Sequence, residues 1–91
     1  MTLTLVTRAY CHLCDEMRDA LAPLAAAHGA TIVERDVDAD ATLEARWGEW
    51  VPVLLAGDAE HGIEVCHYVL DRARALAALR GDPLAAGAEI R

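Results

Sequence analysis

Two cysteines three residues apart, Cys11 and Cys14, stand where a β-forming stretch gives way to a helical one. Residues 3–7 alternate in character and are rich in β-formers, so they predict a first strand. From Cys14 onward, apolar residues recur every three or four positions, which is the period of a helix. This junction restricts the chain to folds that present a cysteine pair at the start of a helix.

The rest of the chain predicts an alternation of strands and helices. The first helix is expected to begin near Cys11 or His12 and to end before Gly29. Further strands are predicted at 30–33, 50–56 and 63–69, and further helices at 41–47 and 72–80, with Asp40 and Asp71 as N-caps. The order β-α-β-α-β-β-α requires a parallel crossover first and permits an antiparallel pair at the end. We therefore expect an α/β fold: a four-stranded mixed sheet with helices on both faces.

Length, composition and charge narrow the class of protein. The 91 residues allow a single domain over residues 1–91, with 82–91 expected to form a loose tail. A net charge of −7 disfavours nucleic acid as a partner. The chain contains no apolar run long enough to span a membrane and no secretory signal. The sequence thus favours a cytoplasmic protein without a membrane partner, and a monomer is the default.

The spacing of the pair suggests different roles for its two thiols. Residues three apart share one face of a helix, and the first would lie at the helix start while the second lies one turn inside. Cys11 would then be accessible and attack, whereas Cys14 would be shielded and resolve. The helix N-terminus favours the thiolate that attack requires. Arg8 and a protonated His12 would add to this effect, and two carboxylates in the first turn would oppose it.

The cysteines also allow other interpretations of their role. A C-x-x-C pair also occurs in zinc sites, but structural zinc usually takes four ligands and this pair stands alone, so no metal site is predicted. The third cysteine, Cys66, falls in a predicted strand. Burial in the core is its expected role because cysteine is among the most buried residue types. A regulatory thiol or a metal ligand is the alternative.

Several segments together resemble a known family. Residues 6–15, with Cys11-His12-Leu13-Cys14, resemble the active-site segment of glutaredoxin-like proteins. With Val37-Asp38 and Val51-Pro52-Val53-Leu54, the chain is similar to a short bacterial glutaredoxin-like family of the thioredoxin superfamily over about residues 3–79. The resemblance implies a thioredoxin-like fold and a cis Val51–Pro52 bond, with Pro52 facing the cysteine pair.

The resemblance also implies a substrate site around Cys11. Val51 and Pro52 would position the substrate, and Arg8 is the nearest counterpart of a lysine found in glutaredoxins. Tyr10 would form one wall of the groove or pack under the loop, and His12 would tune the pair or be solvated. The double glycine that helps glutaredoxins to hold glutathione is absent, since the chain reads Cys66-His67-Tyr68-Val69-Leu70-Asp71 there.

The predicted function is therefore that of a thiol–disulfide oxidoreductase, an enzyme that reduces disulfides through a Cys11/Cys14 dithiol. Its partners would be protein disulfides or glutathione-mixed disulfides, with glutathione possible as electron donor. It would need no metal or organic cofactor, because the cysteine pair itself carries the electrons. The alternative is a non-catalytic thioredoxin-fold module that binds a partner or handles a metal.

Overall fold

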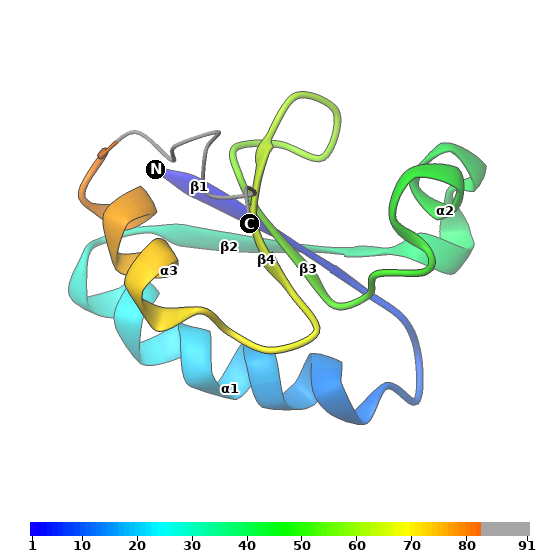
Figure 1. The fold of residues 1–91 in the computed structure, drawn as a ribbon, viewed down its shortest axis with the longest axis horizontal. Helices are drawn as coiled ribbons and strands as arrows, with labels where there is room; N and C mark the ends of the chain where they lie inside the picture. Colours follow the sequence, from blue (N-terminus) through cyan, green and yellow to red (C-terminus); the bar gives the residue numbers. More distant parts are fainter. Residues whose placement is uncertain (83–91) are drawn as a thin grey trace, which may run out of the picture.

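The computed structural model describes residues 1–82 of the chain (Figure 1). Apart from Asp82, the predicted tail lies outside these residues. The strands are β1 (Thr2–Thr7), β2 (Thr31–Asp36), β3 (Val53–Ala56) and β4 (Ile63–His67). The helices are α1 (His12–Ala27), α2 (Ala41–Trp47) and α3 (Arg72–Leu79), with a short 3-10 helix, η1 (Val37–Ala39). Within the described part of the chain, no helix is long and apolar enough to cross a membrane.

The four strands form one mixed sheet in the order β2-β1-β3-β4. β1 pairs with β2 in parallel and with β3 antiparallel, and β3 pairs antiparallel with β4. The parallel crossover through α1 and the antiparallel final pair are both as predicted. The mixed four-stranded sheet is therefore confirmed.

Each face of the sheet carries a core of its own. Because successive strand residues point to opposite faces, Leu5 of β1 packs with Leu21 of α1 and Ala75 of α3, whereas its neighbour Val6 packs with Leu43 of α2. Helices α1 and α3 thus cover one face and α2 the other. Helices on both faces were predicted, and the two cores confirm it.

Side-chain caps fix where the helices begin. The Asp40 carboxylate accepts hydrogen bonds from the N–H groups of Thr42 and Leu43 at 2.9 and 3.2 Å, which satisfies donors that a helix start leaves unpaired. Asp71 does the same for Arg74 at 3.0 Å. Both predicted N-caps are confirmed, and α2 has the predicted bounds.

Three strands end or begin away from their predicted positions. β2 continues to Asp36, because its parallel pairing with β1 extends to the end of that strand. β3 begins at Val53, after Pro52, which has no N–H to donate to a ladder. β4 ends at His67, because Tyr68 takes a left-handed backbone conformation with φ of 65°. The last two differences both fall beside the cysteine pair.

Candidate active site

Three connections meet at the same end of the sheet, where β1 and β4 finish and β3 begins. Val6 near the end of β1 pairs with Val53 at the start of β3, and Val53 pairs with His67 at the end of β4. The connections at residues 8–11, 48–52 and 68–71 therefore all begin or end at this end of the strands. Figure 1 shows them beside the first turn of α1. Segments far apart in the sequence thus meet where the cysteines lie.

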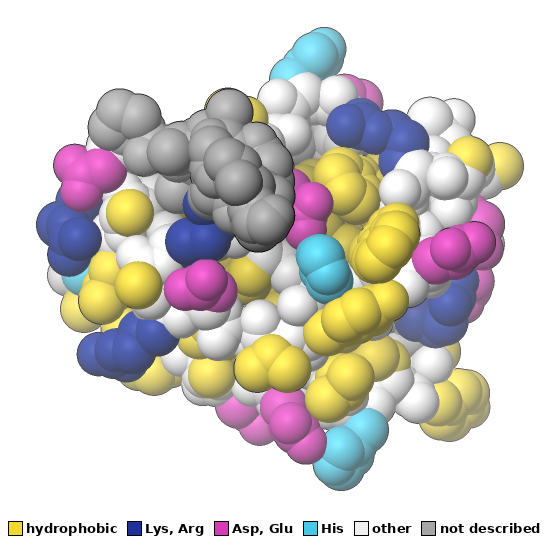
Figure 2. All heavy atoms as spheres, in the orientation of Figure 1, with side chains coloured by type: hydrophobic (Ala, Val, Ile, Leu, Met, Phe, Trp, Pro, Cys, Tyr) yellow, Lys and Arg dark blue, Asp and Glu magenta, His cyan; other side chains and the backbone are white. Residues whose placement is uncertain are grey.

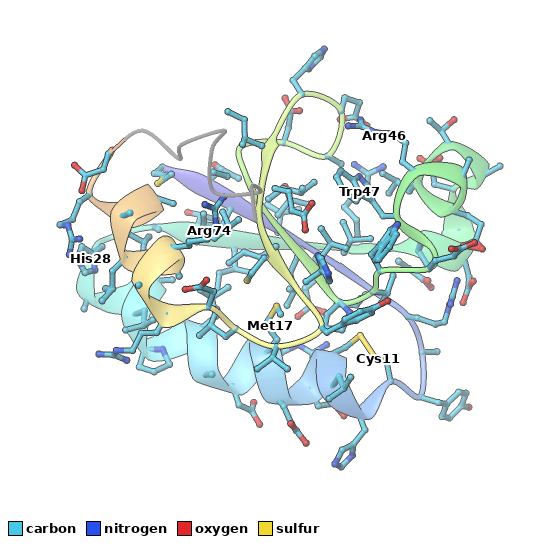
Figure 3. All side chains as sticks on the ribbon, viewed as in Figure 1. Cys11, Met17, His28, Arg46, Trp47 and Arg74 are labelled. Atoms are coloured by element: carbon cyan, nitrogen blue, oxygen red, sulfur yellow. A yellow bond between two sulfur atoms is a disulfide. The ribbon has the colours of Figure 1, made fainter. Side chains whose placement is uncertain are left out.

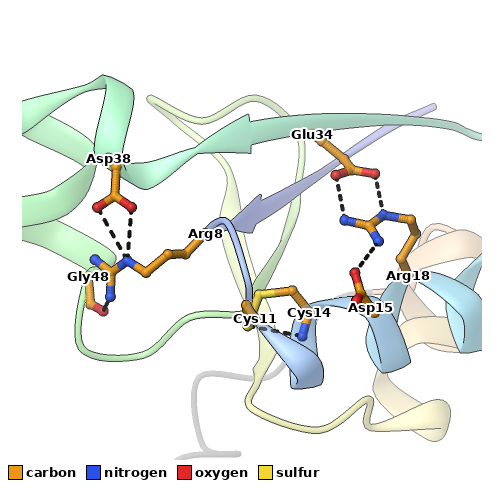
Figure 4. Close-up of a disulfide and its surroundings, with 8 residues drawn as sticks. All are labelled: Arg8, Cys11, Cys14, Asp15, Arg18, Glu34, Asp38 and Gly48. Carbon is orange, nitrogen blue, oxygen red and sulfur yellow. Dashed lines mark hydrogen bonds and ion pairs between the residues drawn. A yellow bond between two sulfur atoms is a disulfide. The ribbon is translucent and has the colours of Figure 1, made fainter.

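Cys11 and Cys14 form a disulfide across the first turn of α1, with Cα atoms 5.2 Å apart (Figure 4). Cys11 is the N-cap residue, and its Sγ accepts a hydrogen bond from the backbone N–H of Cys14 at 3.1 Å. Cys11 is partly exposed, whereas Cys14 is buried with 1% of its surface accessible. The first residue of the pair is therefore within reach of solvent, whereas the second is shielded.

The position of Cys11 suits a reactive thiolate. The N–H groups of the first helical turn have no acceptors within the helix, and together they carry a partial positive charge. The N–H that now points at the Cys11 sulfur would stabilise a negative charge there after reduction. Cys14 begins the buried stripe of α1, which continues with Met17 beneath the sheet (Figure 3). This burial holds the second sulfur within reach of the first.

Arg8 lies close to the cysteines in sequence but is directed away from them (Figure 4). Its Nε is 3.3 Å from the Asp38 carboxylate and its Nη2 is 2.8 Å from Glu44 Oε1. Its Nη1 donates a longer hydrogen bond of 3.4 Å to the carbonyl of Gly48. The guanidinium thus braces the active-site connection against the segment that holds α2, and its charge is already balanced by two carboxylates.

The Arg8→Met variant is expected to lose stability rather than thiol reactivity. Removing two half-exposed ion pairs should lower the free energy of unfolding by about 0.5–1 kcal/mol. The alkylation rate of reduced Cys11 at neutral pH should stay within about twofold of the wild-type rate, because the helix N-terminus remains. Arg35→Met, which removes similar ion pairs to Asp40 and Glu60, is the matched control for urea unfolding. A large loss of Cys11 reactivity in Arg8→Met alone would contradict this.

The other predicted site residues lie at the same end of the sheet as the cysteine pair but differ in exposure. Tyr10 is fully exposed and has a positive φ of 58°, and the exposed His12 ring lies 3.1 Å from the Glu16 carboxylate. Val51 is half-buried and Pro52 is buried. The Val51–Pro52 peptide bond is cis.

The backbone at Val51 is available to a partner. Among residues 1–82, neither its N–H nor its C=O makes a hydrogen bond. The neighbouring carbonyl of Pro52 is different, because it accepts from the Tyr68 N–H at 2.9 Å. An unpaired donor and acceptor on one residue match the pattern by which an extended chain adds to a strand.

Three ring side chains beside this segment form an aromatic cluster of Trp50, His67 and Tyr68. The Trp50 ring centroid is 5.2 Å from that of His67 and 6.1 Å from that of Tyr68, and the last two are 4.7 Å apart. The Tyr68 hydroxyl also donates to the carbonyl of Glu49 at 2.8 Å. These contacts tie the second and third connections together at the site.

Sequence reasoning did not find Tyr68, because the predicted fourth strand ran through it. Within residues 1–82, Tyr10 and Tyr68 are the two non-glycine residues with positive φ. Such conformations cost energy and gather at functional sites. A tyrosine gives little sequence signal for this conformation, so the pairing of strands was needed to reveal it.

Cys66 lies in β4 and is packed against the core between the sheet and helices α1 and α3. Burial raises the pKa of its thiol. A raised pKa leaves less of the reactive thiolate at any pH below it. Its expected role in packing fits this environment.

Alkylation of the reduced protein is expected to separate Cys66 from Cys11. At pH 7, iodoacetamide should modify Cys66 several-fold more slowly in the folded protein than in urea, since burial limits both ionisation and access. The rate at Cys66 should begin to rise at a higher pH in the folded protein than in urea. Mass spectrometry of peptides after timed quenching measures both sites. Equal rates in folded and unfolded protein would show that Cys66 is not shielded.

The cysteine pair supplies two of the four ligands that a structural zinc site usually takes. Among residues 1–82, histidine, cysteine, aspartate and glutamate do not form a group of three or more that could hold an ion.

Comparisons with known proteins agree with this architecture. Residues 2–80 match the model of a family described as "Glutaredoxin-like domain (DUF836)". The X-ray structure of XcR50 from X. campestris is 38% identical, with 89% of this chain and 99% of that chain covered and a TM-score of 0.66. The solution structure of Ne2328 from Nitrosomonas europaea is 30% identical, with 88% and 86% covered and a TM-score of 0.67. The comparison with curated proteins gave no match.

A more distant likeness bears on the fold alone. Thioredoxin 1 from Thermosipho africanus is 17% identical to this chain, with 89% of this chain and 92% of that chain covered and a TM-score of 0.62. The chain therefore has the α/β thioredoxin-like fold predicted for it.

Proposed function

The chain belongs to the glutaredoxin-like domain family, and from this premise we propose that it is a thiol–disulfide oxidoreductase that reduces disulfides through Cys11 and Cys14. One observation carries the proposal. The two cysteines are bonded across the first turn of a helix, with the N-cap residue Cys11 partly exposed and Cys14 buried. This asymmetry gives the two thiols different roles.

The reaction begins with the reduced dithiol. The Cys11 thiolate attacks one sulfur of a substrate disulfide, a mixed disulfide forms, and the other substrate sulfur leaves as a thiolate that takes up a proton. Cys14 then attacks the Cys11 sulfur, which closes the Cys11–Cys14 disulfide and releases the second substrate thiol. Two electrons pass from the protein to the substrate, so no metal or organic cofactor is required.

Other residues of the site serve to position the substrate. The N–H and C=O of Val51, which are unpaired within residues 1–82, would pair with the main chain of the substrate beside Cys11, and the buried Pro52 would hold that segment in place. Tyr10 and His12 flank the attacking sulfur on its own connection. A reductant of this kind suits the reducing cytoplasm, with glutathione or a thioredoxin-type reductase restoring the dithiol.

The test is disulfide reductase turnover of the reduced protein with each of these electron donors. Wild-type protein is expected to turn over with at least one donor, and Cys11→Ser to lose that turnover. The donor that works identifies the reductant. Absence of turnover in folded, fully reduced protein would contradict the proposal, and so would an active Cys11→Ser variant. Absence of turnover would favour a binding or metal-handling module and make metal content the next assay, whereas an active Cys11→Ser variant would show that another group carries the reaction.

A further inference from the structure

A groove of about 340 Å³ lies between α1 and the connection from β4 to α3. Met17, Ala20 and Leu70 give it apolar lining. It adjoins the reacting sulfurs, because Met17 follows Cys14 by one helical turn and because Tyr68, of the aromatic cluster, forms part of the wall. A volume of this size is large enough to accommodate one or two apolar side chains.

The surface that continues from the groove past the disulfide is also apolar. Leu13, Trp50 and Tyr68 each leave about two-fifths of their surface exposed: 40%, 43% and 41%. Figure 2 shows hydrophobic side chains gathered on the face of the molecule where these strand ends lie. Large apolar side chains exposed beside a reactive group indicate a binding surface, because covering them with a partner is energetically favourable.

The arginines near the disulfide are matched by at least as many carboxylates. Arg8 is held by two carboxylates, and Arg18 bridges the carboxylates of Asp15 and Glu34. The groove itself is lined by one arginine, Arg72, and by one carboxylate, Glu16. A chain with a net charge of −7 thus offers no excess cation to an anionic partner at this site.

We propose that the groove and the aromatic cluster select a polypeptide disulfide whose cysteine is flanked by uncharged apolar residues, and that they select against glutathione. The inference rests on the proposed function and names its substrate class. One apolar side chain next to the substrate cysteine would enter the groove while the main chain lies along Val51. The neighbouring residues would cover Leu13 and the aromatic cluster.

Glutathione lacks what this surface recognises. It is a tripeptide with two carboxylates and no apolar side chain, so it would leave the groove empty and bring negative charge to an acidic protein. The chemical step is the same for both partners: Cys11 forms the mixed disulfide, one substrate thiol leaves, and Cys14 releases the other. The selection therefore lies in binding and not in electron transfer.

The experiment compares three symmetric disulfides as oxidants of the reduced protein: the dimer of capped Leu-Cys-Leu, the dimer of capped Gly-Cys-Gly, and oxidised glutathione. Formation of the Cys11–Cys14 disulfide is followed by acid quenching, alkylation and mass spectrometry. Each rate is divided by the rate at which dithiothreitol reduces the same disulfide, which removes differences in intrinsic reactivity. The leucine peptide is expected to react at least about tenfold faster than oxidised glutathione, with the glycine peptide between them.

Ionic strength separates the charge contribution from the apolar one. Raising salt from about 0.01 M to about 1 M shortens the screening length from about 30 Å to about 3 Å. The rate with oxidised glutathione should rise, whereas the rates with the two neutral peptides should change little. Glu16→Gln should raise the glutathione rate several-fold, and Asp19→Asn, an exposed acid one turn along α1, is the matched control.

A groove variant tests the apolar contribution. Ala20→Leu fills the groove and should reduce the ratio of leucine-peptide to glycine-peptide rates by several-fold. Ala26→Leu, exposed near the far end of the same helix, should keep the wild-type ratio.

The outcomes distinguish this inference from the function on which it rests. Equal normalised rates for the three disulfides, or glutathione as the fastest, would overturn the substrate selection and leave the oxidoreductase standing. An equal loss with all three disulfides in Ala20→Leu would overturn the role of the groove. Failure of all three disulfides to oxidise the wild-type protein would overturn the oxidoreductase itself.

Discussion

Replacing Cys14 by serine is expected to convert the protein into a trap that holds its substrate as a mixed disulfide with Cys11. The partly exposed Cys11 remains free to attack, but the buried thiol that would release the substrate is gone. A thiol held in place within the same molecule reacts far faster than one arriving from solution. Steady-state turnover should therefore fall by about a hundredfold or more, and non-reducing mass spectrometry should show the added mass of one substrate thiol.

Two further variants make this expectation specific. Cys11→Ser should form no such adduct, because it leaves the buried Cys14 and the packed Cys66 as the remaining thiols. Cys66→Ser in the wild-type background should keep turnover and form no stable adduct. An adduct on Cys14 in Cys11→Ser would reverse the assigned roles. Prompt release of substrate from Cys14→Ser would show that a thiol from solution resolves the intermediate.

Leu21→Ala is expected to have the largest effect on stability among single truncations in α1. Leu21 is fully buried in the core between α1, α3 and the sheet. Truncating a buried leucine removes apolar contacts and leaves a cavity, at a cost of about 2–5 kcal/mol. A small domain has only about 5–15 kcal/mol of total stability, so the variant should be partly unfolded at physiological temperature.

Urea unfolding of the oxidised protein measures this effect. Leu13→Ala, the same truncation at a half-exposed position of the same helix, should cost less than about 1 kcal/mol. The midpoint of Leu21→Ala should move to lower urea while the slope m stays unchanged. Equal shifts for the two variants would mean that the stripe of α1 does not supply the core as described.

The fold could be predicted from sequence because local signals and the global arrangement agree. Apolar residues at Met17, Leu21 and Leu24 repeat at the helix period, and all of them are buried. Asp40 and Asp71 cap α2 and α3, because a carboxylate accepts hydrogen bonds from the unpaired N–H groups at a helix start. These signals depend on neighbours in the chain, so a sequence reveals them directly.

The active site was only partly predictable, because its remaining parts depend on pairing between distant segments. The positions of Cys11 and Cys14 follow from the strand-to-helix junction. The direction of Arg8 does not, since it depends on Asp38 and Glu44, more than 25 positions away in the chain. Tyr68 joins the site through the Pro52 carbonyl, a contact between two connections that no local pattern encodes.

The strand order also determines where another chain can be received. β2 and β4 lie at the two edges of the sheet. Along β4, the Arg74 side chain already donates to the carbonyls of Glu64 and Val65, at 3.2 and 2.6 Å, and it blocks an incoming strand there. The β2 edge ends in three consecutive charges at 34–36, which resist the self-association that open edges invite. Growth of the sheet into aggregates is thus discouraged at both edges, while the ends of the strands beside the disulfide stay open to a transient partner.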